Sequence, residues 1–274
     1  MIGALEYRLR AEEAGSLPAS HGTMMHAVCF DILHRFSPTL AARVHDGMKE
    51  KPMTSSFLSQ MDGTKKRPAP DKGRWHLPAG TILAWRVTAL TDDVWNAFAS
   101  LPRGAEIQLG DWHLTLTETI IDAQKTPGTG EVDPQTLLET CASMPTPSEL
   151  TLDFRSVTAF RTDQYDVPWP LPEYIFGSLA KRWQTFSMPL ALDDEAVRTQ
   201  ARLLLPTSWH GRSTRKYFGP KRGVLGFTGQ FSFSTERLPE EQRLLFLLLA
   251  QYAELSGTGR WTGYGMGQTR CRWK

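Results

Sequence analysis

The stretch that decides the fold is the C-terminal segment at residues 239–273, PEEQRLLFLLLAQYAELSGTGRWTGYGMGQTRCRW. Its first part, residues 239–255, is apolar on almost every side and opens with two glutamates, which suit the positive end of a helix dipole. Gly257 stands where a helix terminator is expected, and residues 266–273 read as a strand. The chain therefore ends in a buried helix, a glycine-rich connection and a strand.

The N-terminal half predicts the order strand, helix, strands, helix, strand. Apolar residues recur at helical spacing in residues 23–36, and Ser37-Pro38 restarts a helix that runs to about residue 48. The remaining elements are strands at 2–9 and 82–89, a strand or hairpin at 107–120, a helix at 91–99, and a Pro-, Lys- and Gly-rich loop at 63–72.

The same order repeats in the C-terminal half. It predicts strands at 150–157, 202–206, 224–233 and 266–273, and helices at 171–186 and 239–255. Two tandem βαββαβ units, each ferredoxin-like and of the α+β class, fit a chain of 274 residues. A polar segment with several Pro and Gly residues separates them. We expect an N-terminal domain at 1–125, a linker at 126–148 and a C-terminal domain at 149–274.

Composition narrows the class of protein. The net charge is only +2, so any basic surface must be local. The three cysteines lie far apart and no CxxC occurs, which supports neither a disulfide framework nor a zinc ribbon. Charged residues near the start argue against a secretory signal, and the longest apolar run, residues 244–250, is too short to span a bilayer. We expect a cytoplasmic protein that does not bind membranes.

Several familiar site motifs are missing from the sequence. Gly257, Gly259 and Gly263 follow a helix instead of a strand, and too little chain remains for a dinucleotide-binding unit. No P-loop lysine follows them. HxxxH, HExxH and GxSxG motifs are absent, as are carboxylates at ligand spacing. We therefore expect no metal and no cofactor.

Two basic regions favour a nucleic-acid partner. Residues 196–235 contain no Asp or Glu, and their arginines and lysines alternate with aromatic residues, as suits a phosphate backbone with unstacked bases. The glycine-rich stretch adds arginines and has no acid after Glu254, and glycine-lined backbone N–H groups can form anion-binding concavities. The plainer alternatives are a solvated charged face for the first region and a helix cap with a bulged edge strand for the second.

These stretches together resemble the repeat-RNA-cleaving endoribonucleases of CRISPR systems, members of the RAMP superfamily. Residues 257–270, GTGRWTGYGMGQTR, are similar to the glycine-rich loop that closes that family's chains. Residues 219–233, GPKRGVLGFTGQFSF, resemble its basic hairpin and following strand. Residues 156–183, SVTAFRTDQYDVPWPLPEYIFGSLAKRW, and 36–56, FSPTLAARVHDGMKEKPMTSS, resemble its central and early segments. The resemblance spans nearly the whole chain, and the family fold is two ferredoxin-like domains in tandem.

The resemblance implies a metal-independent cleavage. The ribose 2′-OH attacks the adjacent phosphorus, which requires a base, an acid and a cation; histidine suits the proton transfers and Lys or Arg suits the charge. His45 occupies the position of the family's catalytic histidine and Lys51 that of its lysine. Phe30 stands where many relatives have tyrosine, so a three-residue site is left open. His26, where other branches place their histidine, and arginine remain alternatives.

The resemblance also implies partners. We expect the protein to bind CRISPR repeat RNA and to stay bound as a subunit with other Cas proteins, and the alternative is a non-catalytic RAMP subunit that holds the repeat hairpin or guide backbone. The residues expected to contact RNA are Arg212, Arg215, Lys216, Lys221, Arg222, Arg260, Gly263, Gly265, Gly267 and Arg270.

Overall fold

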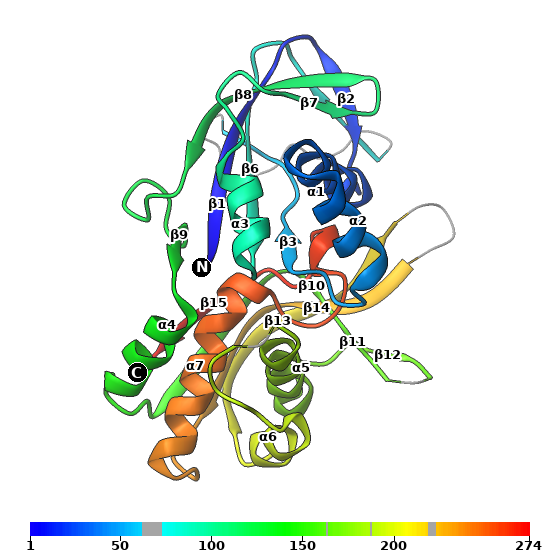
Figure 1. The fold of residues 1–274 in the computed structure, drawn as a ribbon. Coiled ribbons are helices and arrows are strands. Elements are labelled where there is room, and N and C mark those ends of the chain that lie inside the picture. The colour runs from blue at the N-terminus through cyan, green and yellow to red at the C-terminus, as the bar shows by residue number, and fades with distance from the viewer. Residues whose placement is uncertain (62–72, 163, 187, 219–222) are drawn as a thin grey trace.

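A computed structural model describes residues 1–61, 73–162, 164–186, 188–218 and 223–274 (Figure 1). The predicted loop at 63–72 lies outside these residues. The elements of the N-terminal half are β1 (Ile2–Ala11), β2 (Gly15–Pro18), α1 (Gly22–Phe36), α2 (Pro38–Gly47), β3 (Met53–Ser55), β4 (Ser59–Gln60), β5 (Arg74–Leu77), β6 (Ile82–Ala89), α3 (Asp92–Ala99), β7 (Glu106–Leu109) and β8 (Trp112–Ile120). Those that follow are β9 (Gly130–Val132), α4 (Pro134–Ser143), β10 (Glu149–Thr158), β11 (Phe160–Arg161), β12 (Asp166–Val167), α5 (Pro172–Thr185), α6 (Asp194–Ala201), β13 (Leu205–Tyr217), β14 (Gly223–Ser234), α7 (Glu240–Ser256), a short 3₁₀ turn (Thr262–Tyr264) and β15 (Thr269–Trp273).

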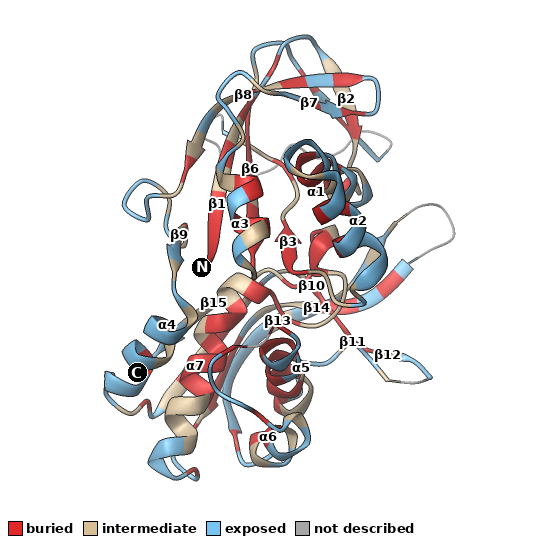
Figure 2. Ribbon diagram, viewed as in Figure 1, coloured by how far each residue is buried: buried red, intermediate tan, exposed pale blue. Residues whose placement is uncertain are grey.

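The N-terminal sheet has the strand order of a ferredoxin-like unit. Its path is β3-β6-β1-β8-β7, with β1 in the middle and antiparallel to both β6 and β8. Most apolar residues of the stripe that the sequence predicts on α1, from Met25 to Leu33, are buried and join the core of this sheet (Figure 2). Phe36, the last residue of the predicted stripe, is instead 47% exposed at the end of the helix. Ser37 accepts a hydrogen bond from the backbone N–H of Leu40, which explains why the second helix begins there.

The C-terminal sheet repeats the arrangement. Its order is β13-β14-β10-β15, again with the first strand of the unit in the middle, and α5 and α7 pack together against it. Gly257 ends α7 with a positive φ of 65°, as the glycine at this place predicts. The prediction of two tandem ferredoxin-like units is therefore confirmed.

The two units are joined by hydrogen bonds at the end of α7. An Nη2 of Arg86 on β6 donates to the carbonyl of Glu254 at 2.9 Å, and the hydroxyl of Thr88 donates to that of Leu255 at 2.6 Å. Ile2 and Leu90, which begin the chain and follow β6, are buried in the hydrophobic cluster of the C-terminal unit. These contacts hold the two units in a fixed position relative to each other. No helix within the described ranges is long and apolar enough to cross a bilayer.

Several stretches differ from the sequence prediction. A strand is expected at 202–206, but residues 202–204 close a turn after α6, and only Leu205 and Pro206 belong to a strand, as the first residues of β13. The segment 126–148, predicted as a linker, contains β9, which pairs with β1, and α4, which contacts α7. These pairings give the segment regular structure despite its polar composition. The domain limits 1–125 and 149–274 stay a prediction.

Candidate active site

Two of the predicted histidines contact one phenylalanine. His26 and Phe30 are one turn apart on α1, with their ring centroids 5.0 Å apart, edge to face. His45, near the end of α2, also lies edge to face with Phe30, with centroids 5.3 Å apart. The restart of the helix at Ser37 turns α2 back against α1, and this turn brings His45 to Phe30. We call His26, Phe30 and His45 the histidine cluster.

The glycine-rich loop at the end of the chain closes over this cluster. Tyr264 stacks on the ring of His26, with centroids 3.9 Å apart and planes within 25°. A Cβ at Gly263 would meet His26 Nδ1 at 3.0 Å, and one at Gly265, whose φ is 89°, would meet the Phe57 ring at 2.5 Å. Gly267 is buried as well. The glycines of this loop are therefore required by contacts within the protein, because a side chain at these positions would push the loop off the N-terminal unit.

Burial decides the protonation of His26. Loss of water around the ring lowers the pKa of His26 to about 4, although the nearby backbone of Gly263 opposes the shift. The positive charge of Lys51 and that of a protonated His45 lower the pKa further. His26 is therefore neutral at pH 7 and can accept a proton there.

His45 is the accessible member of the cluster. Its side chain is 69% exposed, and its Nδ1–H donates to a carboxylate oxygen of Asp46 at 2.6 Å. That bond leaves Nε2 as the nitrogen that can exchange a proton with a ligand. The neighbouring carboxylate also fixes the ring orientation. His45 thus has the contacts of a proton-transfer residue at the surface of the site.

Lys51 closes the end of α2. Its ammonium donates to the carbonyls of Val44, His45 and Met48 at 2.8, 2.7 and 2.6 Å. A cation at this end of a helix is favoured by the dipole. Partial burial lowers the pKa of Lys51, and Asp46 opposes that shift. The predicted cation therefore lies at the end of α2, where it holds the backbone of residues 44–48.

A buried arginine that the sequence did not single out links the loop to this segment. Arg182 on α5 is only 4% exposed, donates to the Thr262 hydroxyl at 2.8 Å, and donates to the Lys51 carbonyl at 3.2 Å. Burial lowers its pKa. Arg182 thus connects the C-terminal unit, the glycine-rich loop and the Lys51 segment through one side chain.

The hairpin of β13 and β14 reaches the same place. The Lys216 ammonium lies 3.7 Å from the centroid of the Phe57 ring, and Phe218 packs edge to face on Trp261 of the glycine-rich loop at 4.4 Å. Arg212 and Arg215 are exposed, and within the described ranges neither forms an ion pair. The other two predicted residues, Lys221 and Arg222, lie outside the described residues.

Arg260 and Arg270 have carboxylate partners, unlike the hairpin arginines. Arg260 pairs with Asp166 and lies over the Trp261 ring, 4.7 Å from its centroid. Arg270 pairs with Glu254 at 2.8 Å. Both are half-buried. An RNA phosphate at either arginine would compete with an existing ion pair, whereas within the described ranges Arg212 and Arg215 have no such pair to displace.

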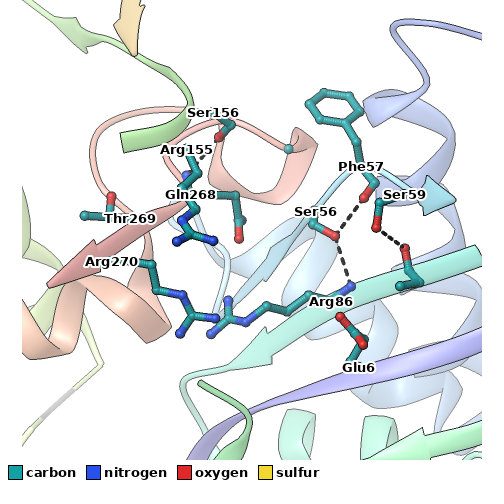
Figure 3. A pocket seen from close by; sticks show the side chains of 12 residues that line it. Glu6, Ser56, Phe57, Ser59, Arg86, Arg155, Ser156, Gln268, Thr269 and Arg270 are labelled. Carbon is teal, nitrogen blue, oxygen red and sulfur yellow. Dashed lines mark hydrogen bonds between the residues drawn. The ribbon is translucent and has the colours of Figure 1, made fainter. Parts of the chain in front are cut away.

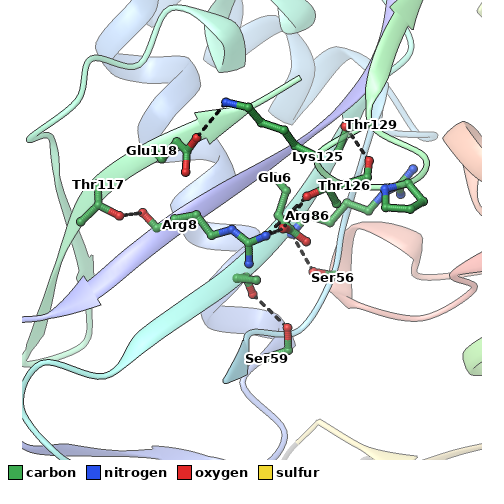
Figure 4. Close-up of polar contacts among 12 residues, drawn as sticks. Glu6, Arg8, Ser56, Ser59, Arg86, Thr117, Glu118, Lys125, Thr126 and Thr129 are labelled. Atoms are coloured by element: carbon green, nitrogen blue, oxygen red, sulfur yellow. Dashed lines mark hydrogen bonds and ion pairs between the residues drawn. The ribbon is translucent and has the colours of Figure 1, made fainter. Parts of the chain in front are cut away.

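A second polar site lies at the junction of the units (Figure 3). Arg86, Arg155 and Arg270 line a pocket of about 280 Å³, and the guanidinium groups of Arg86 and Arg270 point toward one another. Burial and the charge of Arg270 lower the pKa of Arg86 to about 10, and its Nε has no hydrogen-bond partner among the described residues. Glu6, which also lines the pocket, forms an ion pair with Arg8 at 2.6 Å (Figure 4). The pocket has the composition of an anion site.

The sequence analysis did not identify two residues that contact the candidate site from distant parts of the chain. Tyr264 and Arg182 reach the histidine cluster from the C-terminal unit, and no local pattern connects either of them to His26 or Lys51. The described part of the chain holds no group of three or more His, Cys, Asp or Glu side chains placed to hold a metal ion.

Comparison with solved structures defines the class of fold. A Thermus thermophilus Cas6, in a structure described as a product complex, superposes with a TM-score of 0.77 at 24% identity, covering 99% of this chain and 100% of that one. A Cas6 described as a substrate mimic complex gives 0.73 at 22% identity, with 99% of each chain covered. A Cas6-related protein from Pyrococcus furiosus gives 0.63 at 11% identity, again with 99% of each chain covered.

A comparison of sequences identifies a protein family that this chain is similar to. Residues 152–269 match the family model of the CRISPR-associated endoribonuclease Cas6. A comparison with curated protein sequences finds no match. The whole chain thus has the tandem ferredoxin-like fold of these proteins, and its C-terminal unit carries their sequence pattern. The resemblance predicted from the sequence is confirmed.

Proposed function

We propose that this protein is an endoribonuclease that matures CRISPR RNA by cutting one phosphodiester of the repeat without a metal ion. The reaction is an attack of the ribose 2′-oxygen on the adjacent phosphorus. The 2′-OH proton passes to a base, the bond to the 5′-oxygen breaks, and an acid protonates that oxygen. The products are a 2′,3′-cyclic phosphate and a 5′-OH end.

The observation that supports this proposal best is the geometry of the histidine cluster. His26 and His45 both contact Phe30, the glycine-rich loop covers His26 through Tyr264, and the hairpin contacts that loop through Phe218. These segments, which the sequence separates widely, therefore converge near the two imidazoles. An RNA held by the hairpin would place a phosphodiester at this convergence.

The roles follow from exposure and charge. His45 is the accessible proton-transfer group, because its Nε2 is left available by the bond to Asp46. His26 is a second histidine held neutral by burial. Lys51 supplies positive charge for the phosphorane from the end of α2. Tyr264, stacked on His26, places a tyrosine side chain beside this histidine.

The hairpin supplies the grip on RNA. Arg212 and Arg215 are exposed cations without carboxylate partners in the described part of the chain, and they suit phosphates of a folded repeat. We further propose that the product stays bound, that the protein then assembles with other Cas proteins, and that it works in the cytoplasm.

Incubation of the purified protein with repeat RNA in EDTA tests the proposal. We expect a single cut that leaves a cyclic phosphate, and no cut when the nucleotide before the scissile bond carries a 2′-deoxyribose. Binding without cleavage would favour the non-catalytic subunit instead. Cleavage of the 2′-deoxy RNA would exclude attack by the 2′-oxygen.

A further inference from the structure

An apolar groove lies on the C-terminal unit, away from the histidine cluster. It has a volume of about 580 Å³ and runs between β13 and the segment 168–172, which leads into α5. Its lining includes Trp169, Leu171, Trp209, Phe227, Phe231 and Phe233. The phenylalanines are buried, whereas the tryptophans are 58% exposed at Trp169 and 71% exposed at Trp209. Two exposed indoles on one groove are unusual for a surface with no binding role.

The groove arises because β13 is an edge strand. Among the described residues it pairs with β14 alone, and its main contacts are with that strand and not with the helices that cover the rest of the sheet. Figure 2 shows β13 exposed along most of its length. The apolar floor of the sheet thus continues past the helix layer and reaches solvent beside Trp209.

Trp209 is positioned as a stacking platform. It faces Phe231 across the strand pair, and the two rings lie parallel within 6° at 6.5 Å between centroids. Phe231 is 7% exposed and so supports the indole from the protein side. The outer face of the indole stays in solvent, and its orientation is already set before a ligand arrives.

The charge of the groove favours a nucleotide over an apolar peptide as its ligand. Arg212 lines the groove, and no Asp or Glu among the described residues does. Residues 196–235, which include both strands of the hairpin, contain no acidic residue at all. An apolar peptide in the groove would cover Arg212 without supplying a counter-charge, and this carries a desolvation cost. A nucleotide supplies both a ring for Trp209 and a phosphate for Arg212.

We propose that this groove binds unpaired nucleotides of the RNA substrate, with a base stacked on Trp209 and a phosphate at Arg212. The proposal rests on the proposed function and adds to it a second RNA subsite. Trp209 is seven residues before Lys216 on the same strand, about 23 Å at a strand's rise per residue. The groove therefore reads nucleotides remote from the cleaved bond.

Two RNAs and four variants test this subsite. The RNAs are a repeat stem-loop with its single-stranded flanks and the same stem-loop without them. We expect Trp209→Ala to weaken binding of the flanked RNA by about 5- to 150-fold, which is the range for one stacked base. Binding and cleavage of the bare stem-loop should not change. Trp209→Phe should retain most of the affinity for flanked RNA, and Trp169→Ala should share the loss seen with alanine.

Trp273→Ala is the matched control, because Trp273 is a partly exposed tryptophan at the opposite edge of the same sheet. It should leave both affinities unchanged. Equal affinity of the wild type and Trp209→Ala for the flanked RNA would overturn the subsite while cleavage of the stem-loop still upheld the proposed function. If no repeat RNA is bound or cut by the wild type, the proposed function itself fails. A 2-aminopurine scan of the flanks then identifies the stacked base by its quenching in the wild type but not in Trp209→Ala.

Discussion

The second and third strands of the two ferredoxin-like units are built very differently. In the C-terminal unit, β13 and β14 pair over more than ten residues and carry exposed arginines. In the N-terminal unit, β3 pairs with β6 only over Met53–Ser55. The short strand leaves room for the glycine-rich loop of the other unit, which contacts β3 and α1. The same topology therefore gives a long basic hairpin in one unit. In the other unit it gives a surface beside the histidines on which the glycine-rich loop packs.

The largest expected effect tests whether the chemistry belongs to the N-terminal unit. His45→Ala should lower the cleavage rate by about 10²- to 10⁴-fold, because it removes a proton-transfer group. Affinity for repeat RNA should stay close to that of the wild type. His34→Ala, which alters an exposed histidine on the neighbouring α1, is the control and should cut normally. A full rate for His45→Ala in single-turnover assays would transfer the role to His26 or to an arginine.

The next largest effect tests how the glycine-rich loop packs on the N-terminal unit. Gly265→Ala should destabilise the protein by roughly 1–3 kcal/mol, because Gly265 has a φ of 89° and the new methyl would meet Phe57 at 2.5 Å. Urea unfolding measures this change. Gly80→Ala is the matched control, since Gly80 has a φ of 79° but open space around it. Equal losses in the two variants would show that backbone conformation alone matters and that the packing of the loop on Phe57 contributes nothing.

A smaller effect tests whether Arg212 and Arg215 on the β13–β14 hairpin contact RNA phosphates. Replacing Arg212 and Arg215 together by Gln should reduce the slope of log affinity against log salt by about one for each phosphate that the variant no longer neutralises. Cleavage at saturating RNA should change little. Arg237→Gln, in the exposed turn before α7, serves as control and should keep the full slope. An unchanged slope in the double variant would remove the hairpin from the RNA interface.

The smallest effect concerns pH. Because the pKa of His26 is about 4 in the folded protein and 6.5 without the fold, the unfolded chain binds more protons between these values. Stability should therefore fall as pH drops from 6.5 to 4, and part of this fall should vanish in His26→Gln. The ring is partly exposed, so the difference is modest. His113→Gln, at an exposed site, should retain the whole fall, and the same retention in His26→Gln would contradict a buried neutral imidazole.

Local patterns predicted most of the fold. The stripe in α1, the Ser37 cap and the glycine after α7 are each set by neighbours in sequence. Asp133-Pro134 and Asp193 are equally local caps, of α4 and α6. A helix cap could be expected at Asp193, yet few apolar residues follow either cap and neither helix was predicted. Such helices depend on contacts with α7 and α5 that a local window does not contain.

The site was predicted only in part, for a related reason. His26, Phe30 and His45 could be named from the resemblance, but the contacts of Phe30 with both histidines depend on how α2 packs on α1, and the cover by Tyr264 depends on how the two units meet. The same holds for Arg260 and Arg270, whose carboxylate partners are distant or on another element. A charge pattern along the sequence shows where cations are, but not which of them are already neutralised.

The hydrogen bonds at the end of α7 have a consequence for any attempt to divide the protein. The last carbonyls of that helix are satisfied by side chains of Arg86 and Thr88, and Ile2 and Leu90 fill the neighbouring core. A fragment that begins at residue 149 would leave those carbonyls without their hydrogen-bond donors. It would also lack Ile2 and Leu90, and so leave a cavity in its hydrophobic cluster. The two halves therefore have to be inherited, expressed and engineered as one piece, and a chimera that exchanges either half must carry the residues of β6 with it.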